Sequence, residues 1–211
     1  MYLWTVQSKQ VIKMLIRDGV YYPDINKSKG YEDMRLIYPL LLENFNNMNK
    51  GNIDGLIFGF YCENGKENFS SIEDLYEYFS SNPYVTQAFS FWNSNYAILK
   101  IELDESINIM PMDFNDAIKL CIGRTNDIER VEALYNSVDD FNKDIQCILY
   151  HLQMGIVNPY TNCKSFIQGH YPYLKTENIR GIFPNFNKKE SDKGSCLKVF
   201  DLFEEAKNLI Q

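Results

Sequence analysis

The sequence predicts a single α+β domain that spans residues 1–211. Its 211 residues are enough for one well-filled hydrophobic core and few for two independent cores. Hydrophobic residues make up 45% and charged residues 23%, which is typical of a globular protein rather than a disordered one. Segments with strand patterns and segments with helix patterns follow one another, without an internal repeat or a domain linker. These observations favour one domain of helices packed on a sheet.

The first fifty residues predict one strand and two helices. Residues 3–7 form a short apolar strand, and Ser8 can cap the helix that follows. Gly19 can take the left-handed conformation that ends this helix. Residues 20–22 then form a short extended piece. Apolar residues spaced three or four apart predict a longer helix over residues 31–49.

The middle of the chain predicts two more strands and several helices. Residues 56–61 are apolar without a helical period, as in a strand that is covered on both faces. Residues 97–103 alternate, as in a strand with one solvated face. A capping box formed by Ser70 and Glu73 begins a helix. Further helices are expected from Asp113 to Gly123 and, in two pieces, over residues 124–154.

The last third of the chain predicts two strands, over residues 165–168 and 178–183, and a terminal helix with an apolar side from Leu197 to Leu209. Aromatic residues gather in the irregular segment 84–96, which forms either part of the core or an exposed interface. Asp139, Asp140 and Asp144 are expected on a solvated helix surface.

The composition excludes several classes of function. A net charge of −7 repels phosphate backbones, so we expect no nucleic-acid partner. No apolar segment approaches the roughly 20 residues that span a bilayer, and a secretory signal pattern is absent. The five cysteines are odd in number and lack metal-ligand spacing, which indicates a reducing compartment. The sequence therefore predicts a cytoplasmic protein without a membrane partner, and it leaves the oligomeric state open.

Common catalytic motifs are absent from the sequence. There is no GxSxG, GxxxxGK[ST] or GxGxxG, and the two histidines have no spacing that predicts a metal site. His151 falls in a predicted helix, where a packed or surface role is favoured, and His170 follows a predicted strand. A dyad of Cys163 and His170 leaves a cysteine hydrolase open as one class of function.

The sequence resembles an uncharacterised bacterial and phage family, a domain of unknown function. The resemblance rests on LWTVQ at residues 3–7, the helix that runs to Gly19, IELDES at residues 101–106 and the late Ile167-Gln168-Gly169. Members of this family open with an LWTxQ motif and keep a late [IV]Q strand motif. The resemblance covers most of the chain but implies no activity.

More distantly, the sequence resembles mono-ADP-ribosyltransferases. In these enzymes a first strand leads into a helix that ends at a glycine, and a late strand carries a catalytic Glu before a closing hairpin. Residues 167–172 and 177–182 are similar to that hairpin. The resemblance implies a split β-sheet with surrounding helices, and a nucleotide-sized cleft between residues 3–7 and 166–169.

The same resemblance implies which residues bind NAD. Thr5 stands where the family has the His or Arg that holds the nicotinamide ribose, and Gln168 stands at the position of the Glu. Gln7 would hydrogen-bond the ribose or the amide, and Tyr21 or Tyr22 would stack on the nicotinamide. Thr and Gln can hydrogen-bond but carry no charge, so the resemblance implies transferase activity that is reduced or lost.

The residues themselves leave a second function open. The high Tyr and Phe content, the acidic balance and the shortage of catalytic residue types favour a non-enzymatic module that binds a host or phage protein. The sequence therefore predicts either an ADP-ribosyltransferase-like protein that uses NAD and no metal, with a nucleotide or protein substrate, or a protein-interaction module.

Overall fold

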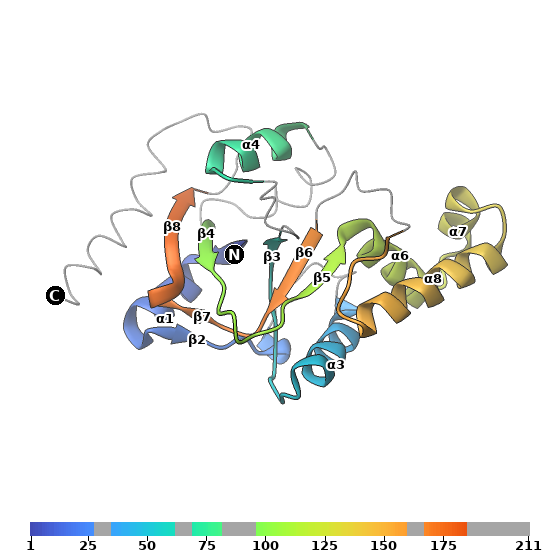
Figure 1. The fold of residues 1–211 in the computed structure, drawn as a ribbon. Coiled ribbons are helices and arrows are strands. Elements are labelled where there is room, and N and C mark those ends of the chain that lie inside the picture. The colour runs from blue at the N-terminus through green and yellow to red at the C-terminus, as the bar shows by residue number, and fades with distance from the viewer. Residues whose placement is uncertain (28–34, 62–68, 82–95, 160–166, 185–211) are drawn as a thin grey trace. The chain divides into compact units, whose positions relative to one another are not determined.

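The computed structural model describes residues 1–27, 35–61, 69–81, 96–159 and 167–184 (Figure 1). Helices and antiparallel strands are mixed along the chain, which confirms the α+β class. The chain groups into two compact units. Unit 1 comprises Met1–Tyr21, Cys62–Asp104 and Tyr173–Gln211, and unit 2 comprises Tyr22–Tyr61 and Glu105–Pro172. The expectation of a single domain stays a prediction.

Unit 1 contains three antiparallel strands in the order β1-β4-β8. Strand β4 (Tyr96–Glu102) pairs with β1 (Tyr2–Ser8) on one edge and with β8 (Ile179–Pro184) on the other. On one face of β4, Ala97, Leu99 and Ile101 are fully buried. On the other face Ile98 is also fully buried, whereas Lys100 and Glu102 are half-buried, so the predicted solvated face is confined to the late part of the strand.

Helix α1 (Lys9–Asp18) begins and ends as predicted. The Ser8 hydroxyl accepts a hydrogen bond from the backbone N–H of Val11 at 3.3 Å. Gly19 ends the helix in the left-handed region, with a φ of 72°, and its N–H donates to the carbonyl of Leu15. The chain then forms β2 (Val20–Tyr21), which pairs with β7 (Leu174–Lys175). Strand β7 is followed directly by the short 3-10 helix η2 (Thr176–Asn178).

Helix α4 (Ile72–Ser81), also in unit 1, begins one residue later than its predicted capping box. The Ser71 hydroxyl accepts from the N–H of Asp74 at 3.2 Å, and the Asp74 carboxylate accepts from the N–H groups of Ser70 and Ser71. The box predicted from Ser70 and Glu73 is therefore wrong. Asp74 takes the capping role in place of Glu73. Its carboxylate accepts from two backbone N–H groups at the helix start and also from the Ser70 hydroxyl, at 2.5 Å.

Unit 2 contains a second set of three antiparallel strands, in the order β3-β6-β5. Strand β6 (Ile167–Tyr171) pairs with β3 (Ile57–Tyr61) on one edge and with β5 (Met110–Asp113) on the other. Because both edges of β6 are occupied, β6 cannot form a hairpin with β8, and the closing hairpin implied by the resemblance is wrong. Strand β5 was not predicted. It contains Pro111, and β5 lies at a sheet edge, where a proline is tolerated.

Helices of unit 2 cover one face of these strands. They are α3 (Tyr38–Asn49), α6 (Phe114–Thr125) and α8 (Val138–Gln153). A short 3-10 helix, η1 (Ile25–Lys27), precedes them, and α7 (Ile128–Leu134) lies between α6 and α8 in the chain. Met110 and Met112 of β5 form one apolar core with Leu41 of α3, Leu120 of α6 and Ile148 of α8. This core fixes the helices on the strands.

Helix α6 begins as predicted but ends later. Asp113 accepts from the N–H of Asn115 at 2.8 Å, as a cap should. The helix then continues through Gly123 to Thr125 and ends at Asn126, which has a positive φ of 53°. The predicted end at Gly123 is wrong, because this glycine keeps a helical conformation and the ring of Phe141 packs 3.5 Å from where a Cβ would stand.

Helix α7 and the first half of α8 form a helical hairpin that projects from the rest of unit 2 (Figure 1). We call residues 127–144 the α7–α8 hairpin. Val131 and Phe141 pack on each other and on Ile122 in a small core of their own. The two helical pieces predicted over residues 124–154 are confirmed.

Several predictions lie outside the described residues: the terminal helix, most of the aromatic segment 84–96, Cys163 and the start of the helix predicted from residue 31. Within the part of the chain that the structure describes, no helix is both long enough and apolar enough to cross a membrane.

Candidate functional site

Thr5 and Gln7 lie on the same face of β1, in unit 1. The side-chain amide of Gln7 donates a hydrogen bond to the Thr5 hydroxyl at 2.8 Å. Thr5 is fully buried and Gln7 is half-buried. The structure therefore brings these two predicted site residues together, as a polar pair that joins the middle of β1 to a position near its end.

The two tyrosines predicted to stack on nicotinamide are neighbours in sequence. Tyr21 ends β2 and is half-buried, whereas Tyr22 is 65% exposed. Tyr22 is therefore the more accessible of the two rings.

Strand β6 places Gln168 and His170 on one face, in unit 2. The Nε2 atom of Gln168 lies 2.9 Å from Nε2 of His170, and Nδ1 of His170 lies 2.5 Å from the backbone carbonyl of Met110. Both side chains are buried. The pair thus links β6 to its neighbour β5 through side chains as well as through the backbone.

The hydrogen bonds of His170 fix its protonation. Burial lowers the pKa of His170 to about 4, so the ring is neutral near pH 7. Because Nδ1 donates its proton to the Met110 carbonyl, Nε2 must accept from the amide of Gln168. The Gln168 nitrogen is therefore held toward His170, and its carbonyl oxygen faces the other way.

Gln168 and His170 point toward the helices of unit 2. Their directly paired neighbours on β5 are Met112 and Met110, whose side chains share the same face and belong to the core under α3, α6 and α8. Phe58 of β3 stands edge-on to His170, with ring centroids 5.0 Å apart. A ligand would reach Gln168 only through movement of these helices.

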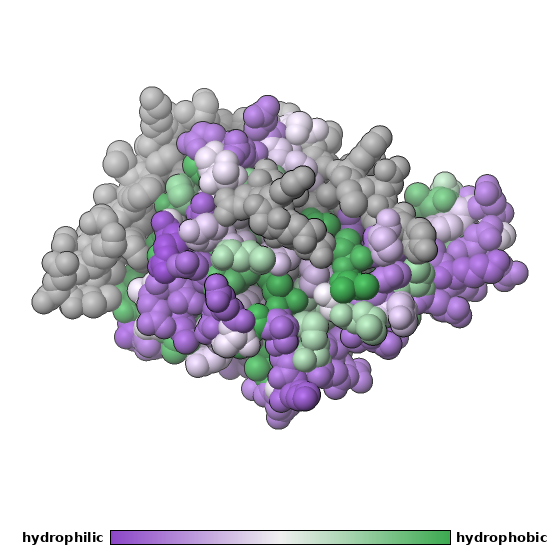
Figure 2. All heavy atoms as spheres, in the orientation of Figure 1, coloured by the Kyte–Doolittle hydropathy of each residue, from purple (hydrophilic) through white to green (hydrophobic). Residues whose placement is uncertain are grey.

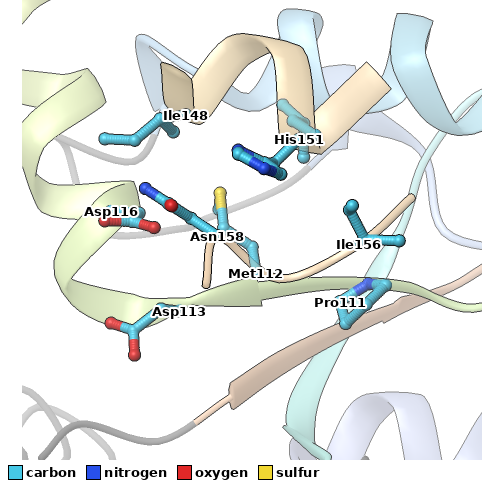
Figure 3. A pocket seen from close by; sticks show the side chains of 9 residues that line it. Pro111, Met112, Asp113, Asp116, Ile148, His151, Ile156 and Asn158 are labelled. Carbon is cyan, nitrogen blue, oxygen red and sulfur yellow. The ribbon is translucent and has the colours of Figure 1, made fainter. Parts of the chain in front are cut away.

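A hollow opens between β5, α6 and α8 in unit 2 (Figure 3). Its lining residues are Pro111, Met112, Asp113, Asp116, Ile148, His151, Leu152, Ile156 and Asn158. The empty volume is about 190 Å³ and includes open solvent. Small-molecule sites usually enclose about 300 Å³ or more, so this hollow is too small for a dinucleotide.

Cys147 and His151 lie beside this hollow, one turn apart on α8. The Cys147 sulfur is 3.5 Å from Nδ1 of His151, but that nitrogen is only 2.8 Å from the Cys147 carbonyl, to which it donates. A nitrogen that donates its proton cannot accept one from the thiol, so the pair lacks the general base of a cysteine nucleophile. The i, i+4 spacing was the signal that sequence reasoning missed.

Lys119 joins α6 to α8 through a network of charges. Its ammonium lies 2.8 Å from Asp144 and 3.3 Å from Asp116, and the Tyr135 hydroxyl also donates to Asp144. Burial, together with the bond to Asp144, raises the pKa of Tyr135 to about 12. The expectation that Asp144 is solvated surface is wrong, because its side chain is only 25% exposed and accepts both bonds.

Most of the exposed large apolar side chains belong to the helical part of unit 2 and the residues just after it. Among the described residues, ten large apolar side chains are exposed, and seven of them lie between residues 118 and 156. They are Ile118, Ile128, Leu134, Val138, Tyr150, Met154 and Ile156. Figure 2 shows apolar surface on α7, at the tip of the projecting and otherwise hydrophilic hairpin.

No family model, curated protein or solved structure matches the chain. The described part of the chain also holds no group of three or more His, Cys, Asp or Glu side chains that could bind a metal ion.

Proposed function

We propose that the chain is a protein-interaction module that binds its partner through the α7–α8 hairpin. The observation that carries this proposal is the exposure of Ile128, Leu134 and Val138, at 61%, 60% and 49%, on that projecting hairpin. Full burial of a fully exposed side chain of this kind contributes roughly 1.5–3 kcal/mol, and covering these half-exposed side chains contributes about half of that each. A partner that binds the hairpin would cover these three apolar side chains.

The hairpin is held in shape before a partner arrives. Asp127 caps α7 and Ser137 caps α8 through bonds to backbone N–H groups. Tyr135 stacks edge-on against Phe141, and the Lys119–Asp144 pair fastens α8 to α6. A preorganised surface loses less conformational entropy on binding, which supports a role in recognition.

The burial of the polar side chains in β1 and β6 also supports the interaction function over a ligand site. Thr5, Gln168 and His170 are buried, and the hollow beside α8 is smaller than a nucleotide. The exposed helices of unit 2 are therefore more accessible to a partner than the polar groups are to a ligand.

Co-purification from cells of the organism that encodes the chain tests this proposal. The double variant Leu134→Asn with Val138→Asn should lose the bound partner, because it places amides where apolar contacts form. The matched control is Leu36→Asn, which changes another exposed leucine (45%) outside the hairpin and should keep the partner. Equal recovery of the partner by both variants would overturn the proposal.

A second candidate is an ADP-ribosyltransferase-like protein with a split β-sheet that binds NAD or a related nucleotide. The orientation of the Gln168 amide favours it. With its nitrogen held by His170, Gln168 turns its carbonyl oxygen away from the ring, and this oxygen is the part of an amide that can replace a carboxylate as acceptor of a ribose hydroxyl. Such a site binds a sugar without supplying the negative charge that transferase chemistry uses.

Thermal unfolding with added NAD tests the second candidate. A ligand that binds the folded chain raises its melting temperature, so millimolar NAD should raise that of the unmodified chain. The rise should be smaller in Gln168→Leu, and separately in Thr5→Val, while the control His151→Asn keeps it. An unchanged melting temperature of the unmodified chain excludes this candidate.

A further inference from the structure

The helices of unit 2 are held by two separate apolar cores. The larger core joins α3, α6 and α8 to β5, and none of the residues described for it belongs to α7. The smaller core consists of Ile122, Val131 and Phe141, with Tyr135 and Ile145 packed against it. Because α7 takes part only in the smaller core, its departure would leave the contacts of the larger core in place.

Helix α7 depends on few contacts for its stability. Of its seven residues, six are exposed, and Val131 alone is buried. Isolated helices are marginal in water below about 12–15 residues, so a segment of this length does not stay helical by itself. The Asp127 cap bonds to the N–H of Arg130, but this bond is local and does not join α7 to another helix. The helix is therefore held by Val131 and by the residue that follows it.

Tyr135, directly after α7, joins the end of this helix to α8. Its ring stands edge-on to Phe141, with centroids 5.2 Å apart, and its hydroxyl donates to the Asp144 carboxylate. The same carboxylate lies 2.8 Å from the ammonium of Lys119, on α6. The acceptor of the Tyr135 hydroxyl is thus held in place by a residue outside α7.

From these contacts we propose that residues 127–136 form a latch, which opens and closes as a unit while the rest of unit 2 stays folded. The bond from Tyr135 to Asp144 sets how often the latch opens. The closed form predominates, because Val131 is buried only there. Local opening occurs in segments with few buried apolar contacts and an exposed backbone, and α7 has both properties.

Helix α8 stays folded when the latch opens. Its second half contributes Ile148 and Leu152 to the larger core, so that half is fixed independently of α7. Adding residues to an existing helix is easier than starting a new one, and the first half of α8 continues from the fixed half. Phe141 therefore stays on α8 and loses only the side chains that cover it from the latch.

Opening of the latch changes the surface proposed to bind a partner. Ile128 and Leu134, which are exposed in the closed form, belong to the latch and move with it. The latch thus regulates that surface, a consequence that rests on the proposed interaction function, whereas the opening itself does not.

Hydrogen exchange of single amides, followed by NMR in the folded chain, tests the latch. The N–H groups of Val131 and Tyr135 donate to the carbonyls of Asp127 and Val131, so their exchange reports the opening of α7. After correction for intrinsic rates, they should exchange about a hundredfold faster than the amides of Leu120 and Ile148, which belong to the larger core. Equal rates would overturn the inference, because α7 would then unfold only together with its unit.

Tyr135→Phe keeps the ring and removes the bond to Asp144. Exchange at Val131 should become roughly tenfold faster, since a hydrogen bond to a charged group is lost, while the amides of the larger core keep their rates. The matched control Tyr150→Phe removes the hydroxyl of a tyrosine that is 58% exposed on α8, and it should change none of these rates. An unchanged rate at Val131 in Tyr135→Phe, or an equal acceleration in the larger core, would also contradict the latch. Co-purification of a partner tests the interaction function separately, so the two proposals fail independently.

Discussion

At the residue scale, the burial of His170 makes the free energy of unfolding depend on pH. Burial lowers its pKa from 6.5 to about 4, so the unfolded chain binds a proton in this range and the folded chain does not. The free energy of unfolding therefore rises with pH across the window, and the contribution of His170 is lost as pH falls from 6.5 through about 4. The loss amounts to about 3 kcal/mol.

Urea unfolding of the chain and of His170→Asn, at neutral pH and near the folded pKa, measures this contribution. Carboxylates titrate in the same window, so the informative quantity is the difference between the two proteins. We expect the unmodified chain to lose more stability on acidification than the variant. Equal losses would show that His170 is not a buried neutral group.

Lys119 offers a second test at the residue scale. Lys119→Met removes the ammonium that lies 3.3 Å from Asp116, whose side chain is 2% exposed, and one bond to Asp144. We expect it to lower the free energy of unfolding by about 1–3 kcal/mol. Lys143→Met removes a looser pair, 3.8 Å from Asp140, on an exposed surface, and should cost less than about 0.5 kcal/mol. Chemical denaturation that gave equal costs would contradict this difference.

The sequence identified polar residues in the strands but not their partners. The Gln7 bond to Thr5 and the Gln168 bond to His170 both join positions two apart, which share a face in any strand. A strand prediction could therefore have found both pairs. The bond from His170 to Met110 crosses 60 positions, and no local pattern indicates it.

At the element scale, two glycines that look alike in sequence behave differently. Gly19 ends α1 with a φ of 72°, whereas Gly123 lies inside α6 without a positive φ. Gly19→Ala should lower the free energy of unfolding by about 1–2 kcal/mol, because an L side chain is strained in the left-handed region. Gly123→Ala should be neutral or should raise it by up to about 1 kcal/mol, since alanine favours a helix and its Cβ would meet Phe141 at an ordinary distance of 3.5 Å.

Thermal and urea unfolding of the two variants, measured side by side, check this contrast. Gly19→Asn serves as the control, because asparagine tolerates a positive φ better than alanine and should cost less than Gly19→Ala. If Gly123→Ala were the more destabilising of the two alanine variants, Gly123 and not Gly19 would be the residue whose conformation requires glycine.

Elements with local signals were the ones that the sequence predicted well. The start and end of α1 depend on Ser8 and Gly19, which act through bonds to residues within four positions. Strand β5 was missed. It has only four residues and contains Pro111, which a strand tolerates at a sheet edge, and edge position depends on distant partners. The predicted helix end at Gly123 was wrong for a similar reason. Gly123 lies inside α6 and packs against Phe141 of another helix, and this contact depends on a residue distant in sequence.

At the scale of the whole molecule, strand neighbours are far apart in sequence. In unit 1, β1 pairs with β4, so that Tyr2 faces Glu102, and in unit 2 β3 pairs with β6, so that Ile57 faces Tyr171. The late hairpin was implied by the resemblance to mono-ADP-ribosyltransferases, and the pairing of β6 with β3 and β5 replaces it. Non-local pairing of this kind has no signature in periodicity or capping, so the order of the strands was beyond sequence reasoning.

This interleaving predicts that neither half of the chain folds alone. A fragment of residues 1–104 contains β1 and β4 without β8, and β3 without β6, while residues 105–211 contain the missing strands. Unpaired strand edges and half-built cores cannot offset the loss of conformational entropy on folding. Far-UV circular dichroism should show each fragment largely unfolded, with helix and strand signal returning when the two are mixed. A cooperative thermal transition in either fragment alone would show that its strands find sufficient partners within that half, and the distant pairing would not be required for folding.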